Sequence, residues 1–379
     1  MALLATASAD NTINIYSVPA EPTPNTPFKL LRTLRAHLAG VNAIAWSPVG
    51  PPYTLASASD DKSILLWSPL SSDFPISPSP LVGHSNYVYS LAFSPKGNML
   101  VSGSYDEAVF LWDVRAGRVM RSLPAHSDPV GGVDFLRDGS MVCSCAGDGL
   151  IRIWDAGSGQ CLKTLVDEDR RPVTSVRFTP NGRFVLAWTL DNSIRLWRYT
   201  EGACVKTYQG HVNQEYNLSG TVGNYYSSTN PGAGAEAFLA SGSEDGDVVA
   251  WDVTSKETLW RGKGHSDVVL SLDFGRTKAG QGLLVSGGKD RDLRVWSLDG
   301  EAERRRQDLA RAGSDEMDPN MGMDMDVDMQ APAEAELDLN NDQTEQDRHR
   351  GPERPEQKPA AENGTAMDVD VNTPGLETT

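Results

Sequence analysis

The sequence predicts an all-β fold built from seven copies of one unit, and two repeating marks support this prediction. A histidine opens the unit in five places, namely His37, His84, His126, His211 and His265. A turn aspartate is followed six residues later by an aromatic residue in all seven units: Asp10–Tyr16, Asp61–Trp67, Asp106–Trp112, Asp148–Trp154, Asp191–Trp197, Asp245–Trp251 and Asp290–Trp296. One unit cannot bury both of its faces alone. The units are therefore expected to stack radially into a seven-bladed β-propeller.

The repeated unit is clearest in residues 83–113, where three apolar runs and the turn between two of them can be recognised. A Gly-His pair precedes the runs VYSLAF, MLVSGS and AVFLW, whose apolar residues are dense enough for strands buried between neighbouring blades. Ser-Pro-Lys-Gly-Asn separates the first two runs and has the composition of a tight turn. These marks, at a spacing of roughly 40–45 residues, are those of WD repeats. Because buried His and Trp nitrogens need partners, we expect a hydrogen-bonded His–Ser–Asp–Trp network in each blade.

The two ends of the repeat region differ from this pattern. LLATASADNTINIYS, which follows Met1, matches the second and third strands of a blade, and FKLLRTL matches its outer strand. The last unit offers three strands, VVLSLDF, GLLVSGG and DLRVW. Two of 28 strands are therefore expected to be absent at the seam, where open sheet edges favour aggregation. A start codon placed too late is the favoured explanation, and closure by a partner or by the tail is the alternative.

Charge and composition divide the chain into a propeller, residues 1–299, and a disordered acidic tail, residues 300–379. Residues 301–379 contain 21 acidic and 8 basic residues, so most of the net charge of −17 lies there. Such a segment buries too little apolar surface to order itself. No basic face is visible in the remainder, which argues against direct nucleic-acid binding. No apolar run approaches the roughly 20 residues of a membrane-spanning helix, so no membrane partner is expected.

The side chains that catalysis or metal binding would need are already assigned to the repeat. Five of the six histidines occupy the repeat position, and His349 lies in the tail. The four cysteines form no Cys-x-x-Cys pair and are expected to be reduced structural thiols: Cys143, Cys145, Cys161 and Cys204. No phosphate-binding loop or dinucleotide fingerprint is present. We therefore expect a protein that is not an enzyme and has no metal or cofactor.

Several segments resemble the WD-repeat subunit of histone H3 lysine-4 methyltransferase complexes of the COMPASS/MLL type. They are GHSNYV, SGSYDEAV, LPAHSDPV, DGLIRIWDAGSGQCLKTL, SPKGN, TLDNSIRLW and GSEDG. The resemblance covers about residues 3–298 and is most specific from Leu81 to Leu165. It implies a nuclear, non-catalytic scaffold that is monomeric within a hetero-complex. The implied partners are the SET-domain methyltransferase and other core subunits, with the histone H3 tail as a further candidate. There are two alternatives. One is a WD-repeat adaptor of another complex, such as a ubiquitin-ligase substrate receptor or an RNA-processing scaffold. The other is a propeller enzyme.

The central opening is the first candidate binding site. The residue before each turn aspartate should reach its rim: Ala9, Asp60, Tyr105, Gly147, Leu190, Glu244 and Lys289. The innermost strands should line it with Asn42, Tyr89, Gly131, Ser175, Ser219 and Leu270. Two tyrosines, an aspartate and small residues suit a guanidinium group, which stacks on aromatic faces and donates to carboxylates.

The resemblance implies that this opening holds an arginine between two aromatic rings. Tyr89 matches one ring, whereas Ser219 stands where the other ring is expected and Gly147 where a rim tyrosine is expected. Tyr225 or Tyr226 is a candidate replacement, and ordinary packing is the alternative role of Tyr89 and Tyr105. The predicted peptide-binding residues are Ala9, Gly40, Asn42, Asp60, Tyr89, Tyr105, Ser175, Tyr216 and Leu270.

The resemblance also implies a second partner groove near blades five and six. Asn181, Phe184, Leu196 and Lys206 match its lining, with Thr254 at a less faithful position. An apolar and acidic segment of another core subunit would place its apolar residues on Phe184 and Leu196, and its charge against Lys206. The alternative is an ordinary exposed strand and turn.

Overall fold

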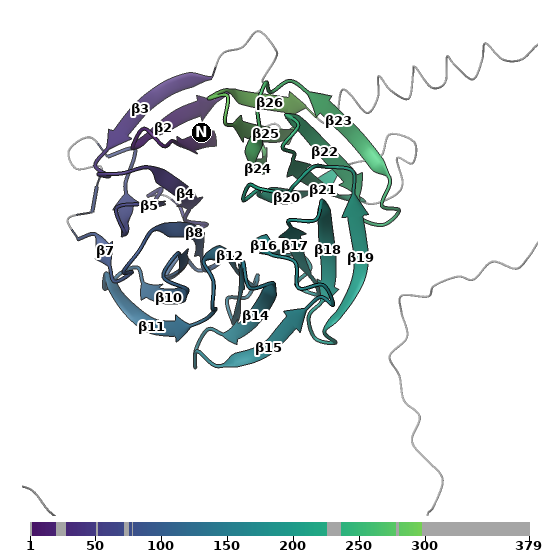
Figure 1. The fold of residues 1–379 in the computed structure, drawn as a ribbon. Helices are drawn as coiled ribbons and strands as arrows, with labels where there is room; N and C mark the ends of the chain where they lie inside the picture. Colours follow the sequence, from purple (N-terminus) through teal and green to yellow (C-terminus); the bar gives the residue numbers. More distant parts are fainter. Residues whose placement is uncertain are drawn as a thin grey trace, which may run out of the picture. The chain divides into compact units, whose positions relative to one another are not determined.

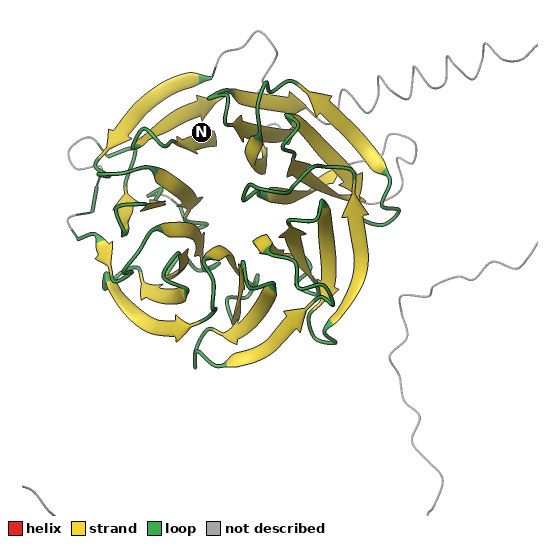
Figure 2. Cartoon of the chain, in the orientation of Figure 1, coloured by secondary structure: helices red, strands yellow, loops and turns green. Residues whose placement is uncertain are grey.

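The computed structural model describes residues 2–19, 28–50, 52–71, 76–77, 79–225, 236–277 and 280–297. All regular structure in these ranges is β (Figure 2), and its 26 strands form seven antiparallel sheets arranged in a ring (Figure 1). The predicted seven-bladed propeller is therefore confirmed. The predicted acidic tail, residues 300–379, and Tyr226 lie outside the described residues.

We number the sheets as blades 1 to 7 in chain order. Their strands are, for blade 1, β1 (Ala2–Ala7), β2 (Thr12–Val18) and β3 (Lys29–Arg35); for blade 2, β4 (Val41–Trp46), β5 (Leu55–Ser59), β6 (Ser63–Trp67) and β7 (Leu81–Val82); for blade 3, β8 (Val88–Phe93), β9 (Met99–Ser104), β10 (Ala108–Asp113) and β11 (Arg118–Pro124); for blade 4, β12 (Val130–Phe135), β13 (Met141–Ala146), β14 (Leu150–Asp155) and β15 (Cys161–Val166); for blade 5, β16 (Val173–Phe178), β17 (Val185–Thr189), β18 (Ser193–Arg198) and β19 (Ala203–Gln209); for blade 6, β20 (Gly220–Tyr225), β21 (Glu236–Gly242), β22 (Asp247–Asp252) and β23 (Thr258–Lys263); and for blade 7, β24 (Val269–Arg276), β25 (Gly282–Gly288) and β26 (Leu293–Ser297).

The seam has the expected strand count within the described ranges. Blades 1 and 7 each contain three strands, in the orders β1-β2-β3 and β24-β25-β26, whereas the other five sheets contain four. Figure 1 shows these two blades side by side, so the first and the last blade are neighbours in the ring.

The core consists of apolar layers between adjacent blades, because the middle strands of each sheet are buried on both faces. One layer joins Ala56 and Ile64 of blade 2 to Leu100 and Trp112 of blade 3, all at most 1% exposed. Equivalent layers join blades 3 and 4, 4 and 5, 5 and 6, and 6 and 7. Side chains from one blade thus complete the core of the next.

The expected histidine network is present in blades 2, 3, 4 and 7. In blade 3, Trp112 Nε1 donates to Ser102 Oγ at 2.8 Å, and Ser102 Oγ lies 2.7 Å from His84 Nε2. His84 Nδ1 lies 3.0 Å from an Asp106 carboxylate oxygen. This geometry fits a neutral His84 with its proton on Nδ1, and burial lowers its pKa. The other three networks are His37–Ser57–Asp61–Trp67, His126–Ser144–Asp148–Trp154 and His265–Ser286–Asp290–Trp296.

The expectation of such a network in every blade is wrong for blade 1, where Tyr16 stands at the tryptophan position, and for blade 5, which has neither its histidine nor its serine. Ala187 occupies the serine position, ten residues before Trp197, and Trp197 Nε1 has no hydrogen-bond partner among the described residues. Arg195 binds the turn aspartate instead, with a 2.7 Å ion pair to Asp191. Burial opposes ionisation of Asp191, but bonds from Arg195 and neighbouring hydroxyls hold its pKa at about 2.

Blade 6 keeps the residues of the network but pairs them differently. Trp188 of blade 5 donates its indole N–H to Ser241 at 3.1 Å, and Trp251 donates to the Gln209 carbonyl instead. Asp245 pairs with Arg261 at 2.8 Å. His211 is therefore left 2% exposed, and neither ring nitrogen has a partner in the described part of the chain.

Candidate peptide-binding site at the central opening

One repeated backbone bond fixes the rim of the opening. In blades 2 to 7 the residue before the turn aspartate donates its N–H to a carbonyl in the segment leading into the innermost strand. The bonds are Asp60–Gly40 at 3.0 Å, Tyr105–Tyr87 at 2.9 Å, Gly147–Pro129 at 3.4 Å, Leu190–Pro172 at 3.1 Å, Glu244–Val212 at 2.9 Å and Lys289–Val268 at 2.8 Å. The rim residues are thus held at equivalent places around the ring.

In each of five blades, a β-bulge leaves one residue of the innermost strand without a partner in the ladder. The bulged residues are Asn42, Tyr89, Gly131, Thr174 and Leu270. A bulge re-aims the extra side chain relative to the ladder. In blade 5 the bulged residue is Thr174, which is 3% exposed, whereas Ser175, predicted to line the opening, pairs with Trp188.

Asp60 and Asn42 form the polar part of the site. Asn42 Nδ2 donates to Asp60 Oδ1 at 2.7 Å and to the Val88 carbonyl at 3.1 Å, which fixes the carboxylate toward blade 3. A Cβ added to Gly40 would lie 3.6 Å from Asp60 Oδ2 and 3.4 Å from the Ala9 Cα. The small residues Gly40 and Ala9 therefore leave space beside the second carboxylate oxygen.

Three tyrosines of blade 3 form the aromatic part. The rings of Tyr89 and Tyr105 meet edge to face, with centroids 6.0 Å apart, and Tyr87 lies 6.1 Å from Tyr105. Tyr105 and Tyr87 are 47% and 43% exposed. Burial and the nearby Asp60 carboxylate raise the pKa of Tyr89, so its hydroxyl stays neutral. Tyr87 was not predicted from the sequence, although it lies two residues before Tyr89.

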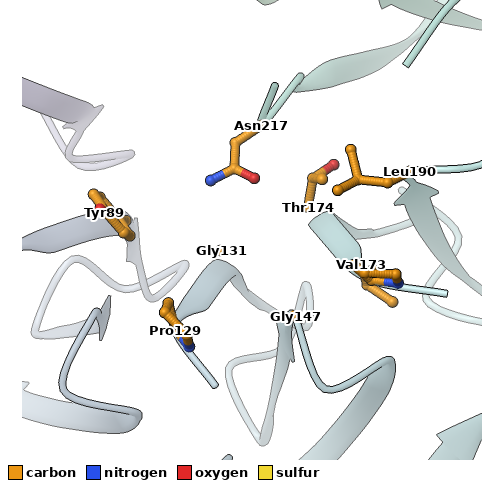
Figure 3. A pocket seen from close by; sticks show the side chains of 9 residues that line it. Tyr89, Pro129, Gly131, Gly147, Val173, Thr174, Leu190 and Asn217 are labelled. Carbon is orange, nitrogen blue, oxygen red and sulfur yellow. The ribbon is translucent and has the colours of Figure 1, made fainter. Parts of the chain in front are cut away.

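A cavity of about 140 Å³ lies beside Tyr89. Figure 3 shows Tyr89 on one side of it and Thr174 and Leu190 on the other, with Asn217, Gly131 and Gly147 between them. A Cβ at Gly131 would lie 2.5 Å from the Thr174 carbonyl oxygen, so this close approach requires glycine. Both glycines line the cavity. Asn217 has no mark in the repeat and was not predicted.

The remaining predicted residues lie across the opening, in blades 6 and 7. Ser219 donates its backbone N–H to the Leu270 carbonyl at 3.1 Å, and Leu270 is 36% exposed. The Tyr216 ring is already covered: Lys289 Nζ lies 4.9 Å from its centroid and donates to its hydroxyl at 2.8 Å. The structure thus groups Ala9, Gly40, Asn42, Asp60, Tyr89 and Tyr105 together, and places Tyr216 and Leu270 apart from them.

Tyr225 does not supply a second ring for the opening. It ends β20, six residues after Ser219 and therefore about 20 Å along an extended chain. Its hydroxyl donates to Asp252 Oδ2 at 3.2 Å, and its ring packs near Phe238. The Tyr225 side chain is engaged by the core between blades 6 and 7.

Three of the four residues predicted for the second groove lie close together in blade 5, namely Phe184, Leu196 and Lys206. Phe184 packs against the core cluster that contains Leu196, and the Arg198 guanidinium lies 5.7 Å from the Phe184 ring centroid. Asn181 shapes the preceding turn by accepting from the Arg183 N–H at 3.1 Å. Lys206, paired with Leu196 across the strands, donates to the Val253 and Thr254 carbonyls at 3.0 and 2.7 Å. Leu196 is 4% exposed, so its side chain belongs to the core rather than to the surface.

The described ranges hold no group of three His, Cys, Asp or Glu side chains placed to bind a metal ion. No helix in them is long and apolar enough to span a bilayer. The opening instead offers one oriented carboxylate, exposed aromatic rings and a small cavity.

Similar proteins connect the fold to a family. A segment of 114 residues is 36% identical to the Polycomb protein EED of Chaetomium thermophilum and covers 29% of this chain and 19% of that protein. A segment of 133 residues is 30% identical to a component of chromatin assembly factor 1 of Mus musculus and covers 30% and 23%. A segment of 97 residues is 36% identical to the small ribosomal subunit protein RACK1 of Drosophila melanogaster and covers 24% and 30%. The chain spans less than a third of the length of each relative.

A family model matches far more of the chain than these relatives do. The model for the WDR5 beta-propeller domain matches residues 1–297, which include every strand described above. The match covers more than half of the chain and agrees with the seven-sheet ring. The chain belongs to the WDR5-type family of WD-repeat β-propellers.

Proposed function

We propose that this chain is a non-catalytic scaffold of a nuclear histone H3 lysine-4 methyltransferase complex. In this proposal the central opening binds an arginine-containing motif of the SET-domain methyltransferase subunit, or of the histone H3 tail. The methyl transfer belongs to the partner. The chain acts as a monomer within the hetero-complex and does not contact nucleic acid directly.

The observation that carries the proposal is the group formed by Asp60, Asn42 and Tyr89. Asn42 donates to one carboxylate oxygen of Asp60, and no described residue donates a hydrogen bond to the other. A guanidinium is planar and can donate to a carboxylate while it stacks on an aromatic ring. The adjoining cavity gives the arginine stem a place to enter.

The second groove supports binding of another core subunit. Phe184 and the outer edge of blade 5 supply apolar surface, and Lys206 supplies a positive charge already positioned by two carbonyls. An apolar and acidic segment matches both features. The likeness to two proteins whose names place them with Polycomb and chromatin assembly agrees with a chromatin role.

A second candidate function is that of a WD-repeat adaptor in another complex. The matches to RACK1, a small ribosomal subunit protein, favour it. This alternative keeps the propeller and the binding surfaces but changes the partners. A ubiquitin-ligase receptor or an RNA-processing scaffold would be of this kind.

A peptide titration tests the arginine site. We expect Tyr89→Ala and Asp60→Ala to weaken binding of a SET-domain arginine peptide by about 1–3 kcal/mol each, because each removes a contact to a charged group. Fluorescence anisotropy measures the affinity, and circular dichroism checks the fold. Arg118→Ala, on the exposed outer strand of blade 3, is the control. Unchanged affinity in both variants would remove the proposed site.

A further inference from the structure

We propose that Lys289 makes the central opening selective for a peptide that carries a carboxylate close to its arginine. This inference rests on the proposed arginine site and names the ligand class more closely. Lys289 stands at the rim position of blade 7, and Asp60 stands at the equivalent position of blade 2. The opening is therefore dipolar, with a positive and a negative charge on its rim.

Lys289 is held in place at the rim. Its ammonium lies over the Tyr216 ring and donates to the Tyr216 hydroxyl at 2.8 Å. This bond, with the negative groups of Asp267 and Glu215 nearby, raises the pKa of Lys289, so the charge persists at neutral pH. No carboxylate in the described part of the chain forms an ion pair with Lys289 within 4 Å. Two of its three N–H donors are thus available to a ligand.

The loop beneath Lys289 is itself fixed. Glu244, the rim residue of blade 6, accepts the backbone N–H groups of Gln214, Glu215 and Tyr216 on one oxygen, at 2.7, 2.7 and 3.0 Å. These bonds hold the segment that presents the Tyr216 ring. The Glu244 carboxylate is consequently occupied by the backbone of this loop, and the Lys289 ammonium faces a ligand with the Asp267 and Glu215 carboxylates nearby.

Small residues separate Lys289 from Asp60. Blade 1 lies between blades 7 and 2, and its rim residue is Ala9. Gly40 lies against Ala9, because a Cβ added at Gly40 would be 3.4 Å from the Ala9 Cα. At the rim position of blade 1, a peptide that passes from one charge to the other would meet the short side chain of Ala9. Its cation would approach Asp60, and its carboxylate would approach Lys289.

The electrostatic consequence separates two kinds of peptide. An arginine in a neutral sequence meets attraction from Asp60 and repulsion from Lys289. A carboxylate near the arginine turns the second interaction into attraction. Because both charges are exposed, each effect is modest and is reduced by salt. We expect a gain of about threefold in affinity, which corresponds to an exposed ion pair.

The test compares two peptide types with three proteins. The peptides contain one arginine in a neutral sequence, either alone or with one glutamate moved through the three positions on each side. The proteins are the full wild-type chain, Lys289→Glu and the control Lys263→Glu, which makes the same charge change on the exposed outer strand of blade 6. Isothermal calorimetry at low and moderate salt gives the affinities.

The expected result is a glutamate position that improves binding about threefold in the wild type and in Lys263→Glu. The same glutamate should weaken binding to Lys289→Glu by a similar factor, whereas the arginine-only peptide should bind this variant more tightly. Equal glutamate effects in all three proteins would overturn the role of Lys289 while leaving the arginine site in place. Failure of every arginine peptide to bind the wild type would overturn both proposals.

Discussion

At the scale of single residues, blade 6 shows how one substitution redirects a buried network. Trp188 occupies a position that is Gly103 in blade 3 and Cys145 in blade 4, and its indole reaches Ser241. Gly220 faces it, and a Cβ there would collide with the Trp188 ring. Ser241 is thus used by the neighbouring blade, and His211 loses the partner that its counterparts keep.

His211 should make stability depend on pH. Burial lowers its pKa to about 4, from a reference value of 6.5. The folded state therefore resists protonation, and this contribution is complete above pH 6.5 and is lost as the pH falls from 6.5 toward 4. The loss should reach up to about 3 kcal/mol. Urea unfolding at pH 7.5 and pH 5 should show a smaller change for His211→Gln than for the wild type, and equal changes would contradict this explanation.

At the scale of the blade, the unit predicted from residues 83–113 is confirmed strand for strand. VYSLAF, MLVSGS and AVFLW are β8, β9 and the main part of β10. The repeat predicts the fold because the serine, histidine and tryptophan that mark it are polar groups that need hydrogen-bond partners when they are buried. The His–Ser–Asp–Trp expectation failed in blades 5 and 6, where Ala187 and Trp188 change which partners are available. It also failed in blade 1, where Tyr16 stands at the tryptophan position.

Blades 3 and 5 offer opposite tests of the buried network. Ser102→Ala should destabilise the protein by about 1–3 kcal/mol, because the Trp112 and His84 nitrogens lose their shared partner. Ala187→Ser should stabilise it by about 1 kcal/mol, because Trp197 Nε1 gains an acceptor. Denaturant unfolding measures both. A loss of stability in both variants would mean that the blade 5 core has adapted to alanine.

The binding surfaces were less predictable than the blades. The position of Asp60 before its turn aspartate follows from the repeat, and so does the place of Tyr89 on an innermost strand. The register of a bulge does not follow from residue type, so the sequence did not indicate that Thr174 is the bulged residue of blade 5. Lys289 over Tyr216 is a contact between blades 7 and 6, 73 residues apart in sequence, and no local pattern indicates it.

At the scale of the whole molecule, the four cysteines differ in burial according to the position of their strand in the blade. Cys143 and Cys145 are fully buried on β13, whereas Cys161 and Cys204 are exposed on the outer strands of blades 4 and 5. Burial raises the pKa of both inner thiols. The expected structural role of the thiols therefore suits the inner pair, while the outer pair faces solvent.

Alkylation should distinguish the two pairs. In the native chain, iodoacetamide should modify Cys161 and Cys204 and spare Cys143 and Cys145, because a buried thiol is both shielded and protonated. All four should react in urea. Peptide mapping by mass spectrometry locates the adducts, and rapid native modification of Cys143 would show that the sheet of blade 4 opens readily.

The most direct test of the proposed scaffold is recovery of its partners from the cells that make it. Tagged wild-type chain and the Asp60→Ala variant would be purified in parallel and their partners identified by mass spectrometry. We predict that the wild type recovers a SET-domain methyltransferase with core subunits. Asp60→Ala should lose the methyltransferase while keeping the partner that docks at Phe184 and Lys206. Recovery of another complex in equal amounts with both proteins would contradict the proposed scaffold role.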